Sequence, residues 1–354
     1  MKFKKQIFGF MDMLRFKKLV PNRREALASG ANTPLPKEYR TNILAHKLHP
    51  GYMTVELTEI RSLTDRMKEY TFKRLDSDAF PFFRAGEYVS LQSKVGDSLV
   101  SRPYSIASSP REALANKLVL GIENAGFFSN YLDTQAKVGD QFTMTEPSGE
   151  FHYENLRDKK NIACIAGGSG ITPFISMAKS MVEGDEDYNM TLFYGARDTQ
   201  HIAYKDELDQ LAAKGLKVVY VLSDEEAEGY EHGFISAAVM EKYVDIKDVT
   251  FFMCGPKAMY DFVLKELEPY SLPIKAIHKD ALYCGDRNVE NPKTFRLTVH
   301  MRDLVYNIDA KENETLLTSM ERAGLNAPNK CRAGGCGSVS YTHLRAHETL
   351  RHLV

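Results

Sequence analysis

The stretch SRPYSIASSP, residues 101 to 110, decides how the rest of the chain is interpreted. Its Arg102 offers a fixed cation for a phosphate, Tyr104 an aromatic face for a flat ring, and Ser105 a hydroxyl for a ring heteroatom. The same motif, Arg-Pro-Tyr-Ser, also ends strands in ordinary β domains. It becomes informative through the motifs that follow it.

The composition predicts an ordinary soluble protein with several domains. The chain has 354 residues, which is enough for two or three domains that each bury a core. A formal net charge of -1 gives no bias toward nucleic acid. We see no apolar run of the ~18 residues that a membrane-spanning helix needs, and no signal-peptide pattern. We therefore expect a cytoplasmic protein that binds no nucleic acid.

Residues 1–48 predict a basic amphipathic helical arm, because apolar residues recur at helical spacing among lysines and arginines. Pro21, Pro34 and Pro36 are expected to break this segment into a connecting arm. Two interpretations stay open. The helix makes a peripheral contact with an anionic membrane, or it packs on the body of the protein as a lid.

Residues 49–155 predict a small antiparallel β-barrel, because short β patterns follow one another with turn residues between them. Residues 137–151 are expected to form its last hairpin. Gly126 lets the backbone approach a ligand and opens a short helix that includes Ser129. Backbone N–H groups at such a helix start favour phosphate. Together with the Arg-Pro-Tyr-Ser motif, this pattern favours a dinucleotide flavin, FAD.

Residues 156–278 predict an α/β domain with a parallel sheet, because apolar strands alternate with helical stretches. The first strand runs into a glycine-rich turn and a helix opened by Thr172 and Pro173, which is the context of a nucleotide site. Ligands of such sheets bind at the carboxyl ends of the strands. The candidate residues at those ends are Gly168, Gly170, Thr172, Arg197, Asp224, Cys254, Gly255 and Pro256.

The C-terminal part predicts a partial iron–sulfur domain. After a linker over residues 279–293, residues 294–338 show a two-strand ribbon, a helix and a cysteine pair. Cys331 and Cys336 match the first half of the plant-type ferredoxin spacing. The third ligand is expected at position 339, which is a valine. The metal-ligand set is therefore incomplete.

Residues 339–354 depart from this pattern and resemble the translation of a sequencing adapter. They contain no cysteine. We expect a non-native tail here, and we expect two cysteines to be too few for a [2Fe-2S] cluster. A metal site made by His343, His347 and His352 is the alternative.

Over residues 50 to about 275 the chain resembles the ferredoxin-NAD(P)+ reductase superfamily, and its C-terminal piece resembles a β-grasp [2Fe-2S] ferredoxin. The order of these modules is similar to that of dioxygenase reductases and of the reductase of hybrid-cluster protein. The resemblance implies a multidomain protein: an antiparallel β-barrel flavin domain, an α/β parallel-sheet nucleotide domain, a truncated ferredoxin domain and an N-terminal helical arm. The motifs that carry it are Arg102-Pro-Tyr-Ser105, Gly126-x-x-Ser129, Gly167-Gly-Ser-Gly-Ile-Thr-Pro173 and Cys254-Gly-Pro256.

The resemblance also implies residue roles on the flavin side. Arg102 would bind a flavin phosphate, Tyr104 would lie against the isoalloxazine, and Ser105 would lie near its reactive edge. Gly126 and Ser129 would receive the pyrophosphate of FAD.

On the nicotinamide side, the resemblance implies that Gly168, Gly170 and Thr172 hold the dinucleotide and that Cys254 lies beside the nicotinamide ring. Tyr104, Ser105 and Cys254 would thus be the catalytic residues. Hydride passes directly between the two cofactors in this family, so the protein contributes orientation and electrostatics.

The choice of nicotinamide depends on two residues. An acidic residue after the second strand suits a free ribose 2'-hydroxyl, whereas a cation suits a 2'-phosphate. Asp224, which two glutamates follow, therefore favours NADH, while Arg197 leaves NADPH open.

The predicted function is an NAD(P)H-dependent flavoprotein oxidoreductase that passes hydride to FAD and then single electrons to an iron–sulfur centre or a partner protein. The sequence does not identify that acceptor. Two alternatives stay open: a non-catalytic electron-transfer or docking module with an incomplete ferredoxin domain, and a two-domain dehydrogenase without flavin.

Overall fold

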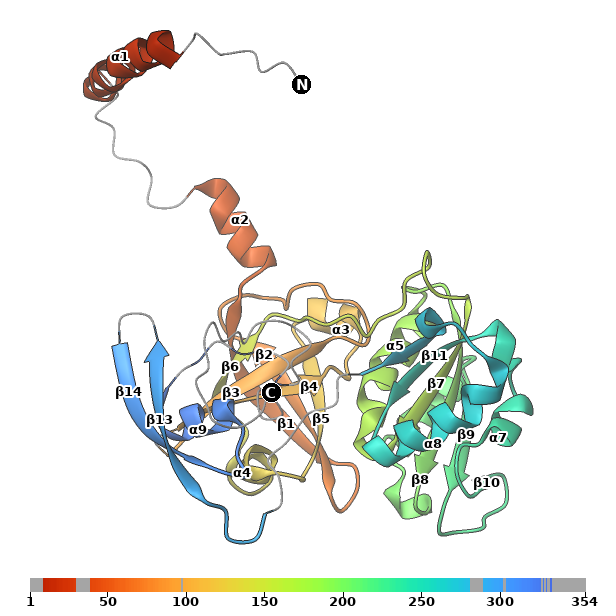
Figure 1. Cartoon of the computed structure of the whole chain (residues 1–354). Coiled ribbons are helices and arrows are strands. Elements are labelled where there is room, and N and C mark those ends of the chain that lie inside the picture. The colour runs from red at the N-terminus through yellow and green to blue at the C-terminus, as the bar shows by residue number, and fades with distance from the viewer. Residues whose placement is uncertain are drawn as a thin grey trace, which may run out of the picture. The chain divides into compact units, whose positions relative to one another are not determined.

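A computed structural model describes residues 9–29, 39–96, 98–280, 289–301 and 304–325, together with residues 327, 329 and 332. Backbone contacts divide the chain into two units, Met1–Leu44 and Ala45–Val354. The second unit holds two six-stranded sheets and a C-terminal hairpin (Figure 1).

Helix α1 (Gly9–Ala28) lies in the first unit, and helix α2 (Arg40–Leu48) begins there and ends in the second. The sequence predicted a break at Pro21, but α1 continues through this residue. Proline removes the N–H that Lys17 would pair with in a regular helix. Both residues are exposed, so water can replace that donor. No helix among the described residues combines the length and the apolar character that a membrane span requires.

The first sheet of the second unit is antiparallel and curls into a half-barrel. Its strands lie in the order β4-β3-β6-β1-β2-β5. Two short helices, α3 (Pro110–Leu114) and α4 (Phe127–Gln135), flank strand β5 in the sequence. The strands are β1 (Tyr52–Ser62), β2 (Met67–Arg74), β3 (Tyr88–Val95), β4 (Ser98–Ser105), β5 (Leu118–Glu123) and β6 (Gln141–Thr145).

Alternation of side chains gives this sheet its core. Met53, Val55 and Leu57 of β1 are buried, whereas the residues between them are at least partly exposed, as expected for a strand with one face on a core. The two outer strands approach each other, because an isolated bridge joins Ile106, just after β4, to Leu120 of β5. The half-barrel therefore nearly closes on the side of the Arg-Pro-Tyr-Ser motif.

The predicted last hairpin over residues 137–151 is wrong, because this stretch supplies a single strand, β6, which pairs with both β1 and β3. After β6 only Ser148 makes a bridge, to Tyr88. Pro147 lacks an N–H for a ladder, and Gly149 has a φ of 126°, which turns the chain away.

The second sheet is parallel, as predicted. Its strands lie in the order β10-β9-β8-β7-β11-β12. The strands are β7 (Asn161–Gly167), β8 (Asn189–Ala196), β9 (Lys217–Leu222), β10 (Glu231–His232), β11 (Thr250–Cys254) and β12 (Ile277–Lys279). The α-helices between them are α5 (Thr172–Glu183), α6 (Lys205–Ala212), α7 (Ala237–Glu241) and α8 (Lys257–Leu267).

The strand order reverses between β7 and β11, because the chain continues to β8 on one side of β7 and returns to β11 on the other. A crevice forms at such a point, outside the carboxyl ends of the two strands. The glycine-rich turn follows β7, and Cys254 ends β11. The fold thus places two of the predicted motifs at one crevice.

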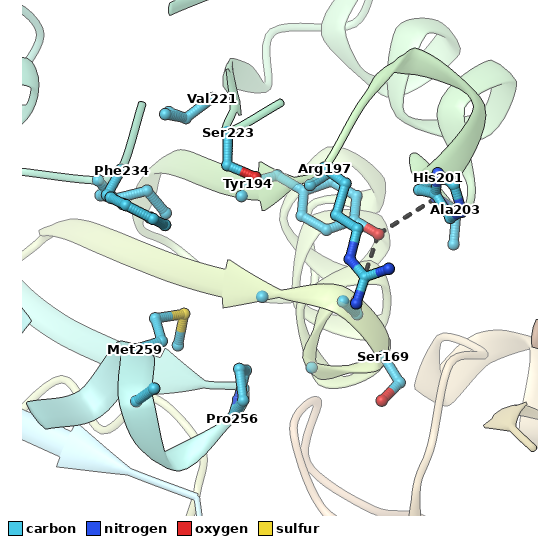
Figure 2. A pocket seen from close by; sticks show the side chains of 18 of the residues that line it. Ser169, Tyr194, Arg197, His201, Ala203, Val221, Ser223, Phe234, Pro256 and Met259 are labelled. Atoms are coloured by element: carbon cyan, nitrogen blue, oxygen red, sulfur yellow. Dashed lines mark hydrogen bonds between the residues drawn. The ribbon is translucent and has the colours of Figure 1, made fainter. Parts of the chain in front are cut away.

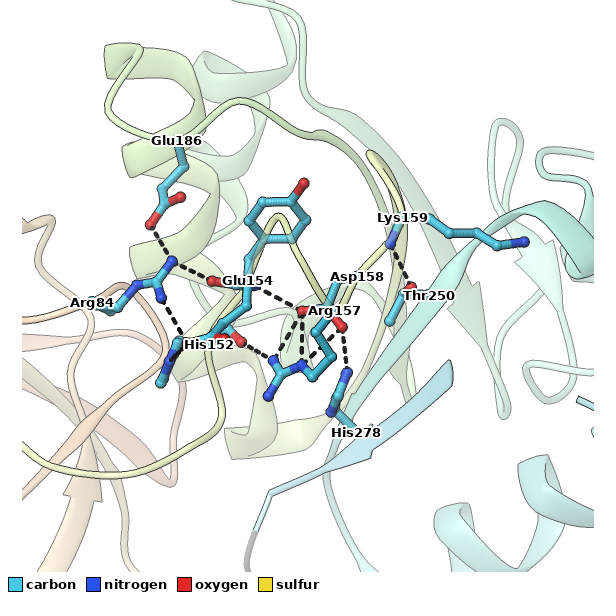
Figure 3. Close-up of polar contacts among 10 residues, drawn as sticks. Arg84, His152, Glu154, Arg157, Asp158, Lys159, Glu186, Thr250 and His278 are labelled. Carbon is cyan, nitrogen blue, oxygen red and sulfur yellow. Dashed lines mark hydrogen bonds and ion pairs between the residues drawn. The ribbon is translucent and has the colours of Figure 1, made fainter. Parts of the chain in front are cut away.

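A polar joint connects the segment between the two sheets with strand β12 (Figure 3). The Asp158 carboxylate is fully buried and accepts hydrogen bonds from Arg157 (2.9 Å) and from Nε2 of His278 on β12 (2.7 Å). Beside it, Arg84 of the half-barrel segment contacts Glu154 at 3.1 Å and Glu186 at 3.5 Å. These contacts fix the last strand of the parallel sheet against the connection to the half-barrel.

The C-terminal segment contains a hairpin of β13 (Thr294–Met301) and β14 (Leu304–Lys311), followed by helix α9 (Leu316–Arg322). The predicted ribbon and helix are therefore present. Thr315 caps α9 by accepting from the N–H of Thr318 at 3.1 Å. Ile308, Leu317 and Met320 form a small core between hairpin and helix.

Candidate active site

The flavin motif lies on an edge strand. Arg102 and Tyr104 of β4 pair with Leu91 and Val89 of β3, and as residues two apart they share one face of the strand. The edge position tolerates Pro103 between them, since its missing N–H faces no further strand. The motif therefore presents a cation and an aromatic ring together.

Tyr104 rests on an aromatic stack that ties β4 to helix α4. Its ring lies 6.5 Å from that of Phe128 with an interplanar angle of 24°, and Phe128 in turn lies 6.0 Å from Tyr131. Phe128 is buried. This support fixes the plane of the Tyr104 ring, which a flat cofactor needs for stacking.

Arg102 keeps donors for an anion. Its Nη1 donates to the Ser101 carbonyl oxygen at 2.8 Å and to Glu321 Oε2 at 3.1 Å. Within the described part of the chain, its Nε and Nη2 have no hydrogen-bond partner. A guanidinium edge of this kind binds phosphate in a bidentate manner. The donor set therefore fits FAD.

The loop before α4 is organised by Ser129. Its hydroxyl accepts from the N–H groups of Gly126 (2.8 Å) and Ala125 (3.0 Å), and it donates to the Gly126 carbonyl (3.0 Å). Ser129 thus shapes the loop, and its only proton is used there. The N–H groups of Phe127 and Phe128, in the first turn of the helix, lack helical acceptors and are the donors that fit a pyrophosphate.

The glycine-rich turn packs tightly on the end of β11. A Cβ at Gly170 would lie 2.1 Å from the carbonyl oxygen of Cys254, so only glycine fits there. Gly168 has a φ of 55° and turns the chain from β7 into the helix. The Thr172 hydroxyl donates to the Ser169 carbonyl at 2.8 Å and closes this turn.

A cavity of about 880 Å³ opens at the crevice (Figure 2). The glycine-rich turn, Arg197 and the Cys254-Gly-Pro256 motif line it, and so do Arg66 and Glu123 from the half-barrel. Its volume is typical of a site for a cofactor-sized ligand. The residues fit a nicotinamide dinucleotide, because the glycines expose backbone and the cations face the cavity.

Three side chains from different segments meet beside this cavity. Asp280 follows β12, and its Oδ2 lies 3.4 Å from the Ser105 hydroxyl and 3.4 Å from the Cys254 sulfur. Both groups donate to this carboxylate. The fold thus joins Ser105 of the half-barrel to Cys254 of the parallel sheet through one acidic residue that the sequence analysis missed.

The Cys254 side chain is held as a thiol. Burial raises its pKa well above the usual value of a cysteine, and the neighbouring Asp280 carboxylate adds to this effect. A thiol donates a proton in its contact with Asp280, whereas a thiolate would repel that carboxylate. Cys254 is therefore suited to orientation and not to nucleophilic attack.

The two residues that bear on the choice of nicotinamide lie in different settings. Arg197 lines the cavity, and no hydrogen bond or ion pair of its side chain to another described residue is present. Asp224 is exposed and accepts from the Ser223 hydroxyl at 2.6 Å, and Ser223, but not Asp224, lines the cavity. The geometry brings the cation closer to the ligand site than the acidic residue.

The predicted iron–sulfur ligands, Cys331 and Cys336, lie outside the described residues, as do His343, His347 and His352. Among the residues with a described position, no group of three His, Cys, Asp or Glu side chains could hold a metal ion. The cysteine pair stays a prediction.

Two protein families match the two sheets. Residues 54–153 match the oxidoreductase FAD-binding domain, and residues 164–265 match the oxidoreductase NAD-binding domain. NADH-cytochrome b5 reductase 1 of Dictyostelium discoideum is 31% identical over 225 residues, which cover 61% of this chain and 77% of that protein. The flavohemoprotein of Oceanobacillus iheyensis is 26% identical over 207 residues, and the match spans 56% of this chain and about half (51%) of the flavohemoprotein.

Among solved structures, phthalate dioxygenase reductase superposes with a TM-score of 0.64 at 21% identity, over 82% of this chain and 85% of that one. Its structure is described as modular, for electron transfer from pyridine nucleotides to [2Fe-2S]. Three observations point to the same kind of enzyme: the two sheets, the FAD-binding and NAD-binding families that match them, and the NADH-cytochrome b5 reductase relative. The chain is therefore an NAD(P)H-dependent flavoprotein oxidoreductase that belongs to the ferredoxin-NAD(P)+ reductase superfamily.

Proposed function

We propose that this chain is a reductase component that takes hydride from NADH or NADPH onto FAD and delivers single electrons to an iron–sulfur centre or a heme protein. The observation that carries the proposal is the meeting of Ser105, Cys254 and Asp280 at the junction of the two sheets. Hydride transfer needs the flavin edge and the nicotinamide held within contact distance. A residue set shared by both sheets is suited to that task.

Bound FAD would accept a hydride and release electrons one at a time. On the flavin side, Arg102 holds a phosphate, Tyr104 supports the ring and Ser105 lies at its reactive edge. Gly126 and the N–H groups of the α4 start receive the pyrophosphate, with Ser129 shaping the loop. These residues contribute by positioning the flavin and by providing charge and hydrogen-bond donors for its phosphates.

On the nicotinamide side, Gly168, Gly170 and Thr172 form the turn that receives the dinucleotide, and Gly255 and Pro256 continue its wall. Cys254 orients the nicotinamide ring. The Asp280 carboxylate accepts hydrogen bonds from both Ser105 and Cys254 at one oxygen, Oδ2, which holds the two donors close to each other.

The domain organisation is part of the proposal: a flavin domain over 49–155, a nucleotide domain over 156–278 and a partial ferredoxin-like domain over 294–338. Residues 1–48 form a helical arm, with peripheral membrane contact as one role. A cytoplasmic location is part of the proposal, and the odd number of cysteines, five, argues against a disulfide framework.

We propose NADH as the preferred nicotinamide, because the acidic Asp224 follows a strand of the parallel sheet, β9. This strand is the third of the sheet along the chain, after β7 and β8, and Arg197 follows the second. Arg197 in the cavity supports NADPH as the second candidate. The variant Arg197→Gln distinguishes the two candidates. If Arg197 binds a 2'-phosphate, the variant is expected to bind NADPH more weakly and NADH as tightly as the wild type.

The acceptor is proposed from the relatives' chemistry. Phthalate dioxygenase reductase is described as transferring electrons to [2Fe-2S], and the other two relatives are named for cytochrome b5 and for heme. The hairpin and α9 support an iron–sulfur module within this chain.

The experiment is an anaerobic visible spectrum of the purified protein during titration with NADH and then NADPH. Flavin bands that bleach at stoichiometric NADH support the proposal, and a remaining iron–sulfur absorption shows that a cluster assembles. A colourless protein contradicts it, as does flavin that neither nicotinamide reduces.

A further inference from the structure

Glu321 of α9 lies between two arginines from different parts of the second unit. Its Oε2 lies 3.1 Å from Nη1 of Arg102 on β4, and its Oε1 lies 2.5 Å from Nη1 of Arg332. The exposed fractions of the three side chains are 6% for Glu321, 15% for Arg102 and 2% for Arg332. Two buried charges and one partly buried charge thus meet where the C-terminal segment contacts the half-barrel.

The charges of this cluster do not balance. Among the described residues, two guanidinium groups surround one carboxylate, which leaves one positive charge without a described counterion in a place largely closed to water. Buried charge without a counterion is unfavourable. Nε of Arg332 is also buried without a hydrogen-bond partner among the described residues. Both features point to a further anion at this cluster.

Glu321 contacts only one end of the Arg102 guanidinium. The two hydrogens of Nη1 are directed to Glu321 and to the Ser101 carbonyl. The opposite edge, made by Nε and Nη2, stays available among the described contacts and matches the geometry of a phosphate. Glu321 therefore fixes the orientation of Arg102 and does not take the place of the phosphate.

The same carboxylate attaches the C-terminal segment to the half-barrel. The N–H of Ser101 donates to Glu321 Oε1 at 3.4 Å, and the Ser98 hydroxyl donates to the carbonyl oxygen of Arg322 at 3.4 Å. Both contacts join α9 to β4, the strand that carries the Arg-Pro-Tyr-Ser motif. Glu321 thus takes part both in the docking of α9 and in the orientation of Arg102.

We propose that Glu321 is a positioning residue that couples docking of the C-terminal segment formed by β13, β14 and α9 to binding of the FAD diphosphate at Arg102. The inference rests on the proposed phosphate role of Arg102. Coupling of two binding events is reciprocal, so FAD tightens the docking by the factor by which docking tightens FAD.

The test uses the full chain as apoprotein and measures FAD binding by quenching of flavin fluorescence. Glu321→Gln is expected to raise the Kd for FAD by about 5- to 150-fold, the usual range of coupling between sites. The matched control is Glu314→Gln. Glu314 pairs with Arg322 at 3.0 Å within the same segment, so its loss leaves the contact with Arg102 intact and the Kd within about twofold.

A second measurement needs no substitution. Hydrogen exchange of residues 316–322 in the wild-type protein is expected to slow when FAD is added, because docking tightens. This result decides the question if circular dichroism shows that the Glu321→Gln protein is unfolded.

Unchanged exchange in α9 together with an unchanged Kd in Glu321→Gln overturns the coupling. Arg102→Ala separates this failure from failure of the proposed function. If Arg102→Ala loses FAD while Glu321→Gln binds it normally, the phosphate role stands and the coupling is wrong. If Arg102→Ala binds FAD as tightly as the wild type, the role on which the coupling rests is wrong as well.

Discussion

The Ser105 hydroxyl, at the end of the half-barrel strand β4, lies 3.4 Å from the Asp280 carboxylate, which follows the last strand of the parallel sheet. The backbone N–H of Asp280 donates to the Met253 carbonyl at 3.0 Å, so its position depends on β11. One carboxylate therefore links the relative placement of a flavin-side residue and the strand that ends in Cys254.

Asp280→Asn is expected to slow flavin reduction by about tenfold, because the hydrogen bonds from Ser105 and Cys254 both lose a charged acceptor, and a loss of about 1.4 kcal/mol corresponds to a factor of ten. FAD content is expected to stay unchanged, since none of the described contacts of Asp280 involves a proposed phosphate ligand. Stopped-flow reduction by NADH measures the rate. The control is Lys279→Gln, an exposed neighbour on β12. Equal rates in wild type and Asp280→Asn would contradict the orienting role.

Cys254→Ala is expected to slow flavin reduction by about tenfold with little loss of FAD, because the thiol lies at the nucleotide crevice. Cys254→Ser restores a donor and is expected to recover part of the rate. Because the pKa of the thiol lies well above its usual value, the ratio of wild-type to Cys254→Ser rates is expected to stay constant from pH 6 to about 8.5. A ratio that changes steeply within this interval would show that the thiol ionises there.

The sequence predicted both sheets because their strand patterns are strong. Continuous apolar runs such as residues 162–166 identified the buried parallel strands, and alternation in β1 identified a half-buried one. The hairpin over 137–151 was mispredicted, since period-two alternation over a few residues does not reveal that a proline and a glycine end the pairing.

The site was less accessible to sequence reasoning than the fold. Asp280 lies in the stretch predicted as a linker, after a strand of only three residues, and nothing local distinguishes it from other surface acids. The one available signal was its place after a parallel strand, where ligands bind. Glu321 follows no motif at all. Its importance comes from long-range contacts with Arg102 and Arg332, which only the folded chain shows.

Asp158→Asn is expected to lower the free energy of unfolding at pH 7 by about 1–3 kcal/mol, because Asp158 is fully buried and accepts from Arg157 and His278. Burial alone would raise the pKa of Asp158, but hydrogen bonds from Arg157, the Glu154 amide and His278 outweigh it and lower the pKa.

The stabilisation from Asp158 is thus present above the unfolded pKa of about 3.9 and is lost as the pH falls through the lower folded value. Urea unfolding from pH 7 to pH 2.5 is expected to show the wild type and Asp158→Asn converging at the acidic end. Asp248→Asn is the control, since Asp248 is an exposed partner of Lys159 nearby. A difference that persists undiminished at pH 2.5 would assign the effect to packing.

Glu87→Gln is expected to stabilise the protein at pH 8, because burial raises the pKa of Glu87 from 4.5 to about 7, an effect that Arg84 only partly offsets. Between these two values the folded chain holds a proton that the unfolded chain has lost, so stability falls as the pH rises through this window. The neutral amide avoids this loss. We expect a gain of about 1–3 kcal/mol at pH 8 and almost none at pH 4.

Urea unfolding at the two pH values measures this difference, with Glu59→Gln, an exposed glutamate of β1, as the control. Glu87 precedes β3, and its carbonyl oxygen accepts from the N–H of Ile106 at 3.0 Å, directly after the Arg-Pro-Tyr-Ser motif. The ionisation of Glu87 is therefore expected to loosen FAD binding as the pH rises from 6 to 8 in the wild type and not in Glu87→Gln. An equal pH dependence of the Kd for FAD in both proteins would show that the ionisation of Glu87 does not affect FAD binding.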